Sequence, residues 1–153
     1  AEYDDDIFVS NKLGLGRLGL NKALNDEFNL PNQYIKPCLL SKKETVELNK
    51  YINAAIDVSD GLLLDLSRIC EKSGVGAQLQ IENKHLTKDF DDLIAGDDYV
   101  MLFTAPTESR ELILSISRSF KVIGKIINDK SISVFDSCGK KLEFNKKGWD
   151  SFN

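Results

Sequence analysis

The sequence has few cysteines and histidines and no long apolar run. Its 153 residues include three cysteines and one histidine, and no two cysteines form a Cys-x-x-Cys pair. A structural zinc site is therefore not expected. No apolar run approaches the roughly eighteen residues of a membrane span, and no signal peptide is recognisable. Together with the odd cysteine count, these absences predict a protein of the reducing cytoplasm with no membrane partner.

Positive charge is also scarce. The chain has 20 lysines and arginines against 24 aspartates and glutamates, which gives a formal net charge of −4. A domain of this sign has no overall attraction to a phosphate backbone, so a nucleic-acid partner is not expected. The composition, 42% apolar and 29% charged, is that of a globular chain. We therefore expect one domain over residues 1–153 with a core of its own.

Hydrophobic periodicity predicts a mixture of strands and helices without strict alternation. Strands are expected at 7–9, 53–58, 77–81, 99–104, 122–127, 131–135 and 142–144, and helices at 18–28, 44–51, 61–74, 86–95 and 108–120. Two prolines, Pro31 and Pro37, predict a loop over 30–42. Asn128 and Asp129 predict a hairpin between the strands on either side. The fold class is α+β or mixed α/β, with a mixed sheet flanked by helices.

A literal G-x-G-x-x-G motif, Gly14 to Gly19, follows the first expected strand. A dinucleotide site also needs a second strand that ends in an acidic residue about twenty positions later, and the loop over 30–42 stands there instead. A nicotinamide or flavin site is therefore disfavoured. The turn either presents helix-start N–H groups to a phosphate or is only a tight connection, and the second interpretation is favoured.

Two carboxylates and a hydroxyl stand where an apolar strand ends and a helix begins, in Asp57-Val58-Ser59-Asp60-Gly61. Mg²⁺ prefers such hard oxygen ligands, and it fills its other positions with water and substrate phosphates. The alternative is that Ser59 or Asp60 merely caps the helix, which explains one acid at most. Both interpretations stay open at this point.

A second acidic corner, Gly96-Asp97-Asp98-Tyr99, precedes another apolar strand. Its acids either face a cleft or belong to an ordinary polar turn. Trp149, the only tryptophan, is either a packing residue or a platform for a heteroaromatic ligand. His85 has no acid, serine or cysteine partner at a known spacing, and we expect it at the surface.

Four segments together resemble the thiamine-monophosphate kinases of the aminoimidazole-ribonucleotide synthetase-like superfamily. Residues 7–14 resemble the family's strand and V-T-G-x-L-G turn, and residues 55–62, A-I-D-V-S-D-G-L, resemble its A-I-D-[IV]-S-D-G-L signature. Residues 96–104 resemble its G-G-E-D-Y-E-L-L-F-T, and residues 148–152 its closing G-[YW]-x-H-F. The resemblance covers nearly all of this chain but only about the second half of a family member.

The resemblance implies a function and roles for five residues. It makes Asp57 and Asp60 magnesium ligands, Ser59 an ATP contact, Asp97 a contact of the thiamine phosphate substrate, and Trp149 part of the thiamine pocket. The implied reaction moves the γ-phosphate of ATP onto thiamine monophosphate and gives thiamine diphosphate. Metal-holding carboxylates and a few donors suffice for this reaction without a protein nucleophile, because phosphoryl transfer needs positioning and charge neutralisation above all.

The resemblance also implies what this chain lacks. In the family, an amino-terminal domain carries further magnesium-binding acids and forms the homodimer, so these residues alone are expected to be inactive. Three positions depart from the family pattern: Asp97 replaces a glutamate, Val100 replaces a second glutamate, and Ser151 replaces a histidine. The implied fold is a mixed sheet flanked by helices, partly ferredoxin-like.

Two alternatives remain. One is another superfamily member, namely selenophosphate synthetase, the hydrogenase-maturation dehydratase or aminoimidazole-ribonucleotide synthetase, and the other is a binding module without catalysis. The D-Y-x-x-L-F-T and G-W-x-x-F segments favour the thiamine kinase.

Overall fold

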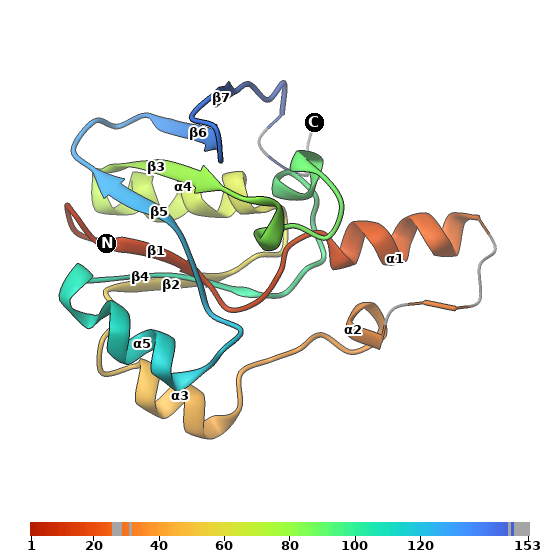
Figure 1. Cartoon of the computed structure of the whole chain (residues 1–153), viewed down its shortest axis with the longest axis horizontal. Helices are drawn as coiled ribbons and strands as arrows, with labels where there is room; N and C mark the ends of the chain where they lie inside the picture. Colours follow the sequence, from red (N-terminus) through yellow and green to blue (C-terminus); the bar gives the residue numbers. More distant parts are fainter. Residues whose placement is uncertain (26–28, 31, 147, 149–153) are drawn as a thin grey trace.

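A mixed seven-stranded sheet lies between two layers of helices (Figure 1). The computed structural model describes residues 1–25, 29–30, 32–146 and 148. Its strands are β1 (Asp6–Val9), β2 (Ala54–Asp57), β3 (Gly76–Ile81), β4 (Met101–Ala105), β5 (Lys121–Ile127), β6 (Ile132–Asp136) and β7 (Lys141–Leu142). Its α-helices are α1 (Leu15–Leu24), α2 (Asn32–Ile35), α3 (Lys42–Leu48), α4 (Leu62–Ser73) and α5 (Arg110–Ile116). The predicted class, a mixed sheet flanked by helices, is confirmed.

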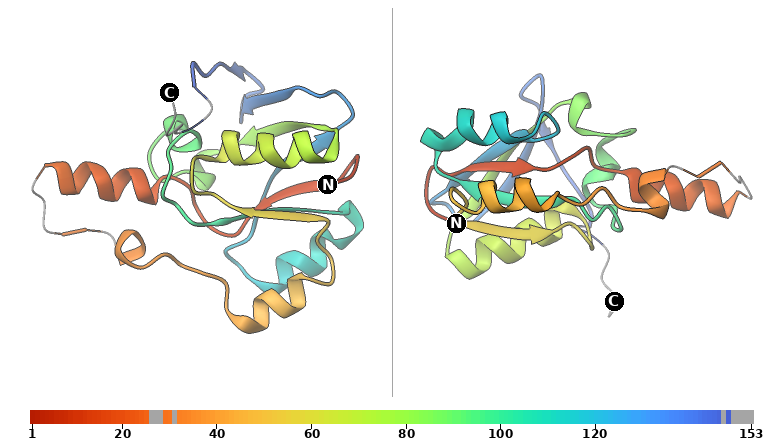
Figure 2. Two further views of the ribbon diagram at one scale, coloured as in Figure 1. Left: turned by 180° about the vertical axis from the view of Figure 1, so that it is seen from behind. Right: turned by 90° about the horizontal axis from the view of Figure 1, so that it is seen from below.

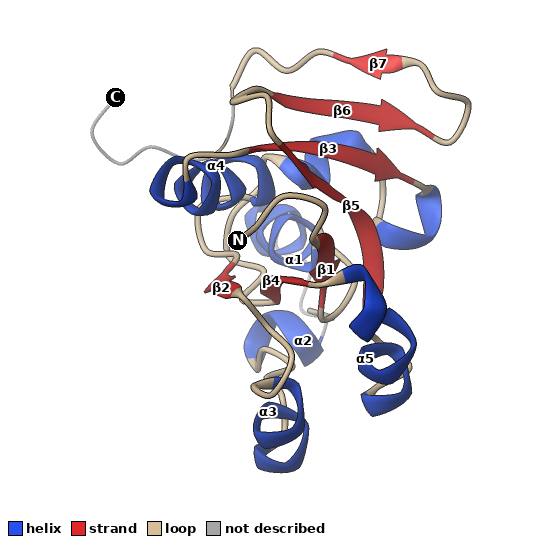
Figure 3. Ribbon diagram, turned by 90° about the vertical axis from the view of Figure 1, so that its left-hand side faces the viewer, coloured by secondary structure: helices blue, strands red, loops and turns tan. Residues whose placement is uncertain are grey.

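The strands run in the order β2-β4-β1-β5-β3-β6-β7. All neighbouring pairs are antiparallel except β3 and β6, which are parallel. Helix α4 covers one face of this sheet, and α3 and α5 lie together on the other face (Figures 2 and 3). Helix α1 projects away from the sheet (Figure 1). No helix in the described ranges combines the length and apolarity needed to cross a bilayer.

Each face of the sheet has its own hydrophobic core. On the α4 side the core includes Leu62 and Leu66 of the helix with Ile7 and Leu79 of the sheet. On the other side Phe8 stacks on Phe103, with ring centroids 5.0 Å apart. This second core is confined to the part of the sheet that α3 and α5 cover. The outer face of β3 is therefore wet, as the predicted alternation of 77–81 requires.

Helix α4 is the element that the sequence predicts best. Its apolar residues recur on one face and are buried, and Gly74 ends it in the left-handed conformation with φ of 70°. Helix α3 begins earlier than predicted, because Ser41 and Glu44 form a reciprocal capping box. The loop predicted over 30–42 contains the short helix α2.

The predicted hairpin between β5 and β6 is wrong. Strand β3 lies between them, paired antiparallel with β5 and parallel with β6. The connection from β5 to β6 therefore crosses the start of β3, where Gly76 allows a close approach. A Cβ atom on Gly76 would lie 1.8 Å from the carbonyl oxygen of Asp129. The turn residues thus make a crossing and not a hairpin.

The region predicted as a helix over 86–95 is mostly irregular. It contains one 3₁₀ turn, Phe90–Leu93, and Leu86 forms a bridge with Leu13. The expectation that His85 is exposed is also wrong, because the ring is only 1% exposed. A 3₁₀ turn over Asn83–His85 brings it inward, and its Nδ1 accepts the backbone N–H of Glu82 at 3.0 Å.

Candidate functional site

Three segments that are far apart in the sequence meet beside the ends of β1, β2 and β4. They are the glycine turn at 14–16, the corner at 57–61 and the loop at 96–99. Backbone contacts this close require glycine: a Cβ on Gly16 would lie 2.5 Å from the carbonyl oxygen of Gly96, and one on Gly96 would lie 2.6 Å from that of Ser59. The two predicted acidic corners are therefore neighbours.

The loop at 96–99 is tied to the corner by its own backbone. The N–H of Asp97 donates to the carbonyl oxygen of Ser59 at 2.9 Å, and that of Tyr99 donates to Val58 at 2.9 Å. Asp97 and Tyr99 have φ of 64° and 50°, a region that non-glycine residues rarely adopt. Both side chains are exposed. The loop thus holds an acid and an aromatic ring outward next to the corner.

Asp98 locks the glycine turn to this loop. Its carboxylate accepts the N–H of Gly14 at 2.7 Å and that of Gly16 at 2.9 Å. The side chain of Asp98 therefore occupies the N–H groups at the start of α1 that a phosphate would need. The interpretation of the glycine turn as a tight connection is the one that this geometry supports.

Burial raises the pKa of Asp98 to about 6, and the nearby Asp92 adds to the rise, although the N–H groups of the turn favour the charged form. Since the pKa of an unfolded aspartate is about 3.9, the folded state binds this proton more tightly. The stabilisation is complete below that unfolded value and is lost as the pH rises through about 6.

We therefore expect the free energy of unfolding of the wild-type chain to fall between pH 4.5 and 6.5 by about 2 kcal/mol more than that of Asp98→Asn. The difference between the two proteins isolates this residue from the other carboxylates. Urea denaturation across that range measures it, and parallel pH profiles would contradict the assignment.

Asp65 organises the corner at 57–61 from within α4. Its carboxylate is fully buried, and Oδ2 accepts the N–H groups of Ser59 at 3.0 Å and of Asp60 at 3.1 Å. Gly61 precedes the helix and makes no side-chain cap. Ser59 and Asp60 therefore do not cap α4, and the capping alternative for this corner is wrong.

The two predicted magnesium ligands stand at opposite ends of the corner and differ in their surroundings. Asp57 ends β2 and is exposed, and within the described residues its carboxylate has no hydrogen-bond or ion-pair partner. The carboxylate of Asp60 is 33% exposed, and its Oδ2 lies 2.7 Å from Nη2 of Arg68. Asp57 thus offers both oxygens, and Asp60 offers one that is free.

This donor set fits Mg²⁺ in chemistry and in number. Magnesium commonly takes one or two carboxylates and completes its octahedron with water and phosphate oxygens. Among the described residues no group of three or more His, Cys, Asp or Glu side chains is arranged to hold a metal ion. The described residues of the corner therefore do not form a closed protein cage for a metal ion.

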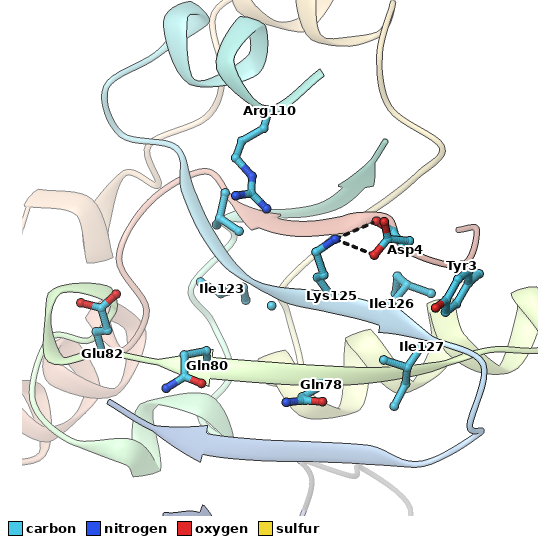
Figure 4. A pocket seen from close by; sticks show the side chains of 12 residues that line it. Tyr3, Asp4, Gln78, Gln80, Glu82, Arg110, Ile123, Lys125, Ile126 and Ile127 are labelled. Atoms are coloured by element: carbon cyan, nitrogen blue, oxygen red, sulfur yellow. Dashed lines mark hydrogen bonds and ion pairs between the residues drawn. The ribbon is translucent and has the colours of Figure 1, made fainter. Parts of the chain in front are cut away.

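A groove of about 400 Å³ opens beside Asp57. It is mostly apolar, with Tyr99, Met101 and Leu39 in its wall. Figure 4 shows a different hollow, of about 360 Å³, on the wet outer face of β3 and β5. None of the predicted site residues that the structure describes lines that second hollow, whereas Asp57 lines the groove.

The structure therefore brings Asp57, Ser59, Asp60 and Asp97 to one region. Trp149, the remaining predicted site residue, lies outside the described residues.

Sequence reasoning missed the residues that hold the site together. Asp65 looks like one more polar position on the wet face of α4, yet it is buried at the corner. Arg17, beside the glycine turn, binds the carboxylates of Asp89, Asp91 and Asp92. For Asp65 one sequence signal was available: it is an acid in the first turn of the helix, four residues after Gly61, where backbone N–H groups attract negative charge.

Comparison with known proteins places the chain in a family. The model of the AIR synthase related protein, C-terminal domain family matches residues 7–137. The chain belongs to this family, and the resemblance to its thiamine-monophosphate kinases is confirmed.

The relatives are about twice as long. The chain is 30% identical to the thiamine-monophosphate kinase of Aquifex aeolicus (strain VF5), over 99% of the chain and 53% of that relative. The structure of AaThiL complexed with AMPPCP and TMP superposes with a TM-score of 0.75 at 28% identity, over 99% of this chain and 52% of that one. The hydrogenase maturation protein HypE of E. coli shares the fold, with a TM-score of 0.77 at 14% identity over 95% and 50%. The chain thus spans about half the length of the curated relatives it matches.

Proposed function

We propose that the chain is the carboxy-terminal half of a thiamine-monophosphate kinase, which transfers the γ-phosphate of ATP to thiamine monophosphate and releases thiamine diphosphate. The observation that carries the proposal is the corner at 57–61, where Asp57 lines a groove, Asp60 keeps one free carboxylate oxygen, and the backbone holds the loop that carries Asp97. Relatives named for this activity match the whole chain, and one related structure is described as complexed with AMPPCP and TMP.

In this proposal Asp57 and Asp60 hold Mg²⁺, Ser59 contacts ATP, and Asp97 and Trp149 contact thiamine monophosphate. Bound magnesium neutralises phosphate charge and orients the oxygens for in-line transfer. The residues of the chain position the two ligands. Asp97 is one methylene shorter than the family's glutamate, so its carboxylate stays closer to the loop backbone that Ser59 fixes.

The other half of the enzyme is an amino-terminal domain of the same protein. It supplies the remaining cation ligands, which fits the absence of a closed metal cage within the described residues. It also forms the homodimer of the intact protein, which works in the cytoplasm. Without that half, the 153-residue chain is expected to give no measurable thiamine diphosphate.

The assay that tests the proposal incubates the intact protein with ATP, Mg²⁺ and thiamine monophosphate and measures thiamine diphosphate by chromatography. Selenide and aminoimidazole precursors serve as competing substrates for the other activities of the superfamily. We expect turnover of thiamine monophosphate alone. Turnover of another substrate in its place, or robust activity of the 153-residue chain by itself, would count against the proposal.

Asp57→Asn is expected to lower kcat/KM of the intact protein on the order of 100-fold, because a neutral amide removes one charged ligand from the cation. Glu71→Gln is the matched control, since Glu71 is an exposed acid near the far end of α4. Steady-state kinetics at saturating Mg²⁺ compare the two. Equal losses in both variants would remove Asp57 from the site.

A further inference from the structure

One arginine joins two of the acids at the corner. Arg68 lies one turn after Asp65 in α4, and its guanidinium reaches back toward the start of the helix. Its Nη2 lies 2.7 Å from Oδ2 of Asp60, and its Nη1 donates to Oδ1 of Asp65. In the part of the chain that the structure describes, Arg68 is the only cation paired with Asp60.

The two contacts of Arg68 differ in how firmly they are held. Asp65 is fully buried and fixed by the N–H groups of the corner. Asp60 is 33% exposed and Arg68 is 45% exposed. An ion pair this exposed is weakly held and exchanges partners at low cost. The Asp60–Arg68 pair is therefore the contact that can open while the rest of the corner stays in place.

The same carboxylate of Asp60 is the one proposed to bind Mg²⁺. A divalent cation at Asp60 repels a guanidinium that stays on the neighbouring oxygen, because both are positive and a few ångströms apart. The displaced guanidinium then lacks an anionic partner for one edge of its planar fork. A phosphate group fills that role well, since guanidinium binds phosphate oxygens through two parallel hydrogen bonds.

We infer that Arg68 is a built-in counter-ion of Asp60, which a divalent cation displaces and which then binds a phosphate of the nucleotide. The inference rests on the proposed function. Arg68 lowers the affinity for the cation when the nucleotide is absent. When the nucleotide is present, the contact of Arg68 with a phosphate raises that affinity. Cation and nucleotide therefore bind cooperatively, and the coupling passes through this one side chain.

The experiment measures the affinity of the intact protein for Mn²⁺ by electron paramagnetic resonance, with and without AMPPCP. The ratio of the two dissociation constants is the coupling factor. Arg68→Gln is expected to tighten Mn²⁺ binding in the absence of AMPPCP by about fivefold and to lower the coupling factor by about tenfold. Arg68→Lys is the matched control: it keeps the charge but loses the planar fork, so its Mn²⁺ affinity without AMPPCP stays within about threefold of the wild type, while its coupling factor falls between those of the wild type and Arg68→Gln.

Asp60→Asn separates failure of the inference from failure of the proposed function. If Asp60→Asn weakens Mn²⁺ binding but Arg68→Gln leaves the coupling factor unchanged, Asp60 is a ligand and the inference is wrong. If Asp60→Asn leaves Mn²⁺ affinity unchanged both with and without AMPPCP, the proposed metal site itself is wrong. A melting temperature within a few degrees of the wild type confirms that each variant is folded.

Discussion

Replacement of Asp65 by alanine is expected to lower the free energy of unfolding by about 4 kcal/mol. The carboxylate is fully buried and accepts the N–H groups of Ser59 and Asp60, while Arg68 donates to its other oxygen. Alanine leaves two backbone N–H donors of the corner and one guanidinium without their acceptor. Urea denaturation monitored by circular dichroism measures the loss.

The matched control for this prediction is Glu71→Ala in the same helix. Glu71 is exposed, so the change in the free energy of unfolding is expected to stay within about 0.5 kcal/mol. Asp65→Asn keeps one acceptor oxygen and is expected to fall between the two. A loss for Asp65→Ala no larger than that of the control would show that the corner is held by something other than this carboxylate.

The second large effect is expected at the start of β3. Gly76→Ala places a Cβ 1.8 Å from the carbonyl oxygen of Asp129 and 2.3 Å from that of Ser131. Both obstacles are backbone atoms of the crossing segment, so relief requires movement of β6 relative to β3. We expect the free energy of unfolding to drop by about 4 kcal/mol, near the upper end for single substitutions.

Gly74→Ala is the matched control for Gly76→Ala. Gly74 has φ of 70°, but a Cβ there meets no atom within 4 Å. The left-handed backbone alone is expected to cost about 1 kcal/mol. Thermal or chemical denaturation of both variants compares them. Equal losses in the free energy of unfolding at the two positions would mean that the crossing segment moves aside at little cost. The crossing would then not be the reason for a glycine at position 76.

The sequence predicts those parts of the fold in which local pattern and final environment agree. Helix α4 is an example, because its apolar stripe faces the core and Gly74 stops it at the predicted place. The corner at 57–61 is another, since an acid that follows an apolar strand has to reach solvent or a partner. For Asp57 the structure shows exposure.

Other features depend on contacts between distant segments. The parallel pairing of β3 with β6 cannot be predicted from the residues that connect β5 to β6, because those residues would suit a hairpin equally well. His85 stands in a polar stretch, and only the turn at 83–85 buries it. The role of Asp98 likewise requires the glycine turn, more than eighty residues earlier, to be beside it.

The insertion of β3 between β5 and β6 also affects how the sheet comes apart. In the part of the chain that the structure describes, β6 and β7 pair with the rest of the sheet through β3 alone, and β7 is two residues long. This terminal ribbon can detach without breaking a hydrogen bond of β1, β2 or β4, which carry the candidate site. Local opening in hydrogen exchange should therefore begin at this end of the sheet, while the amides around the corner stay protected until global unfolding.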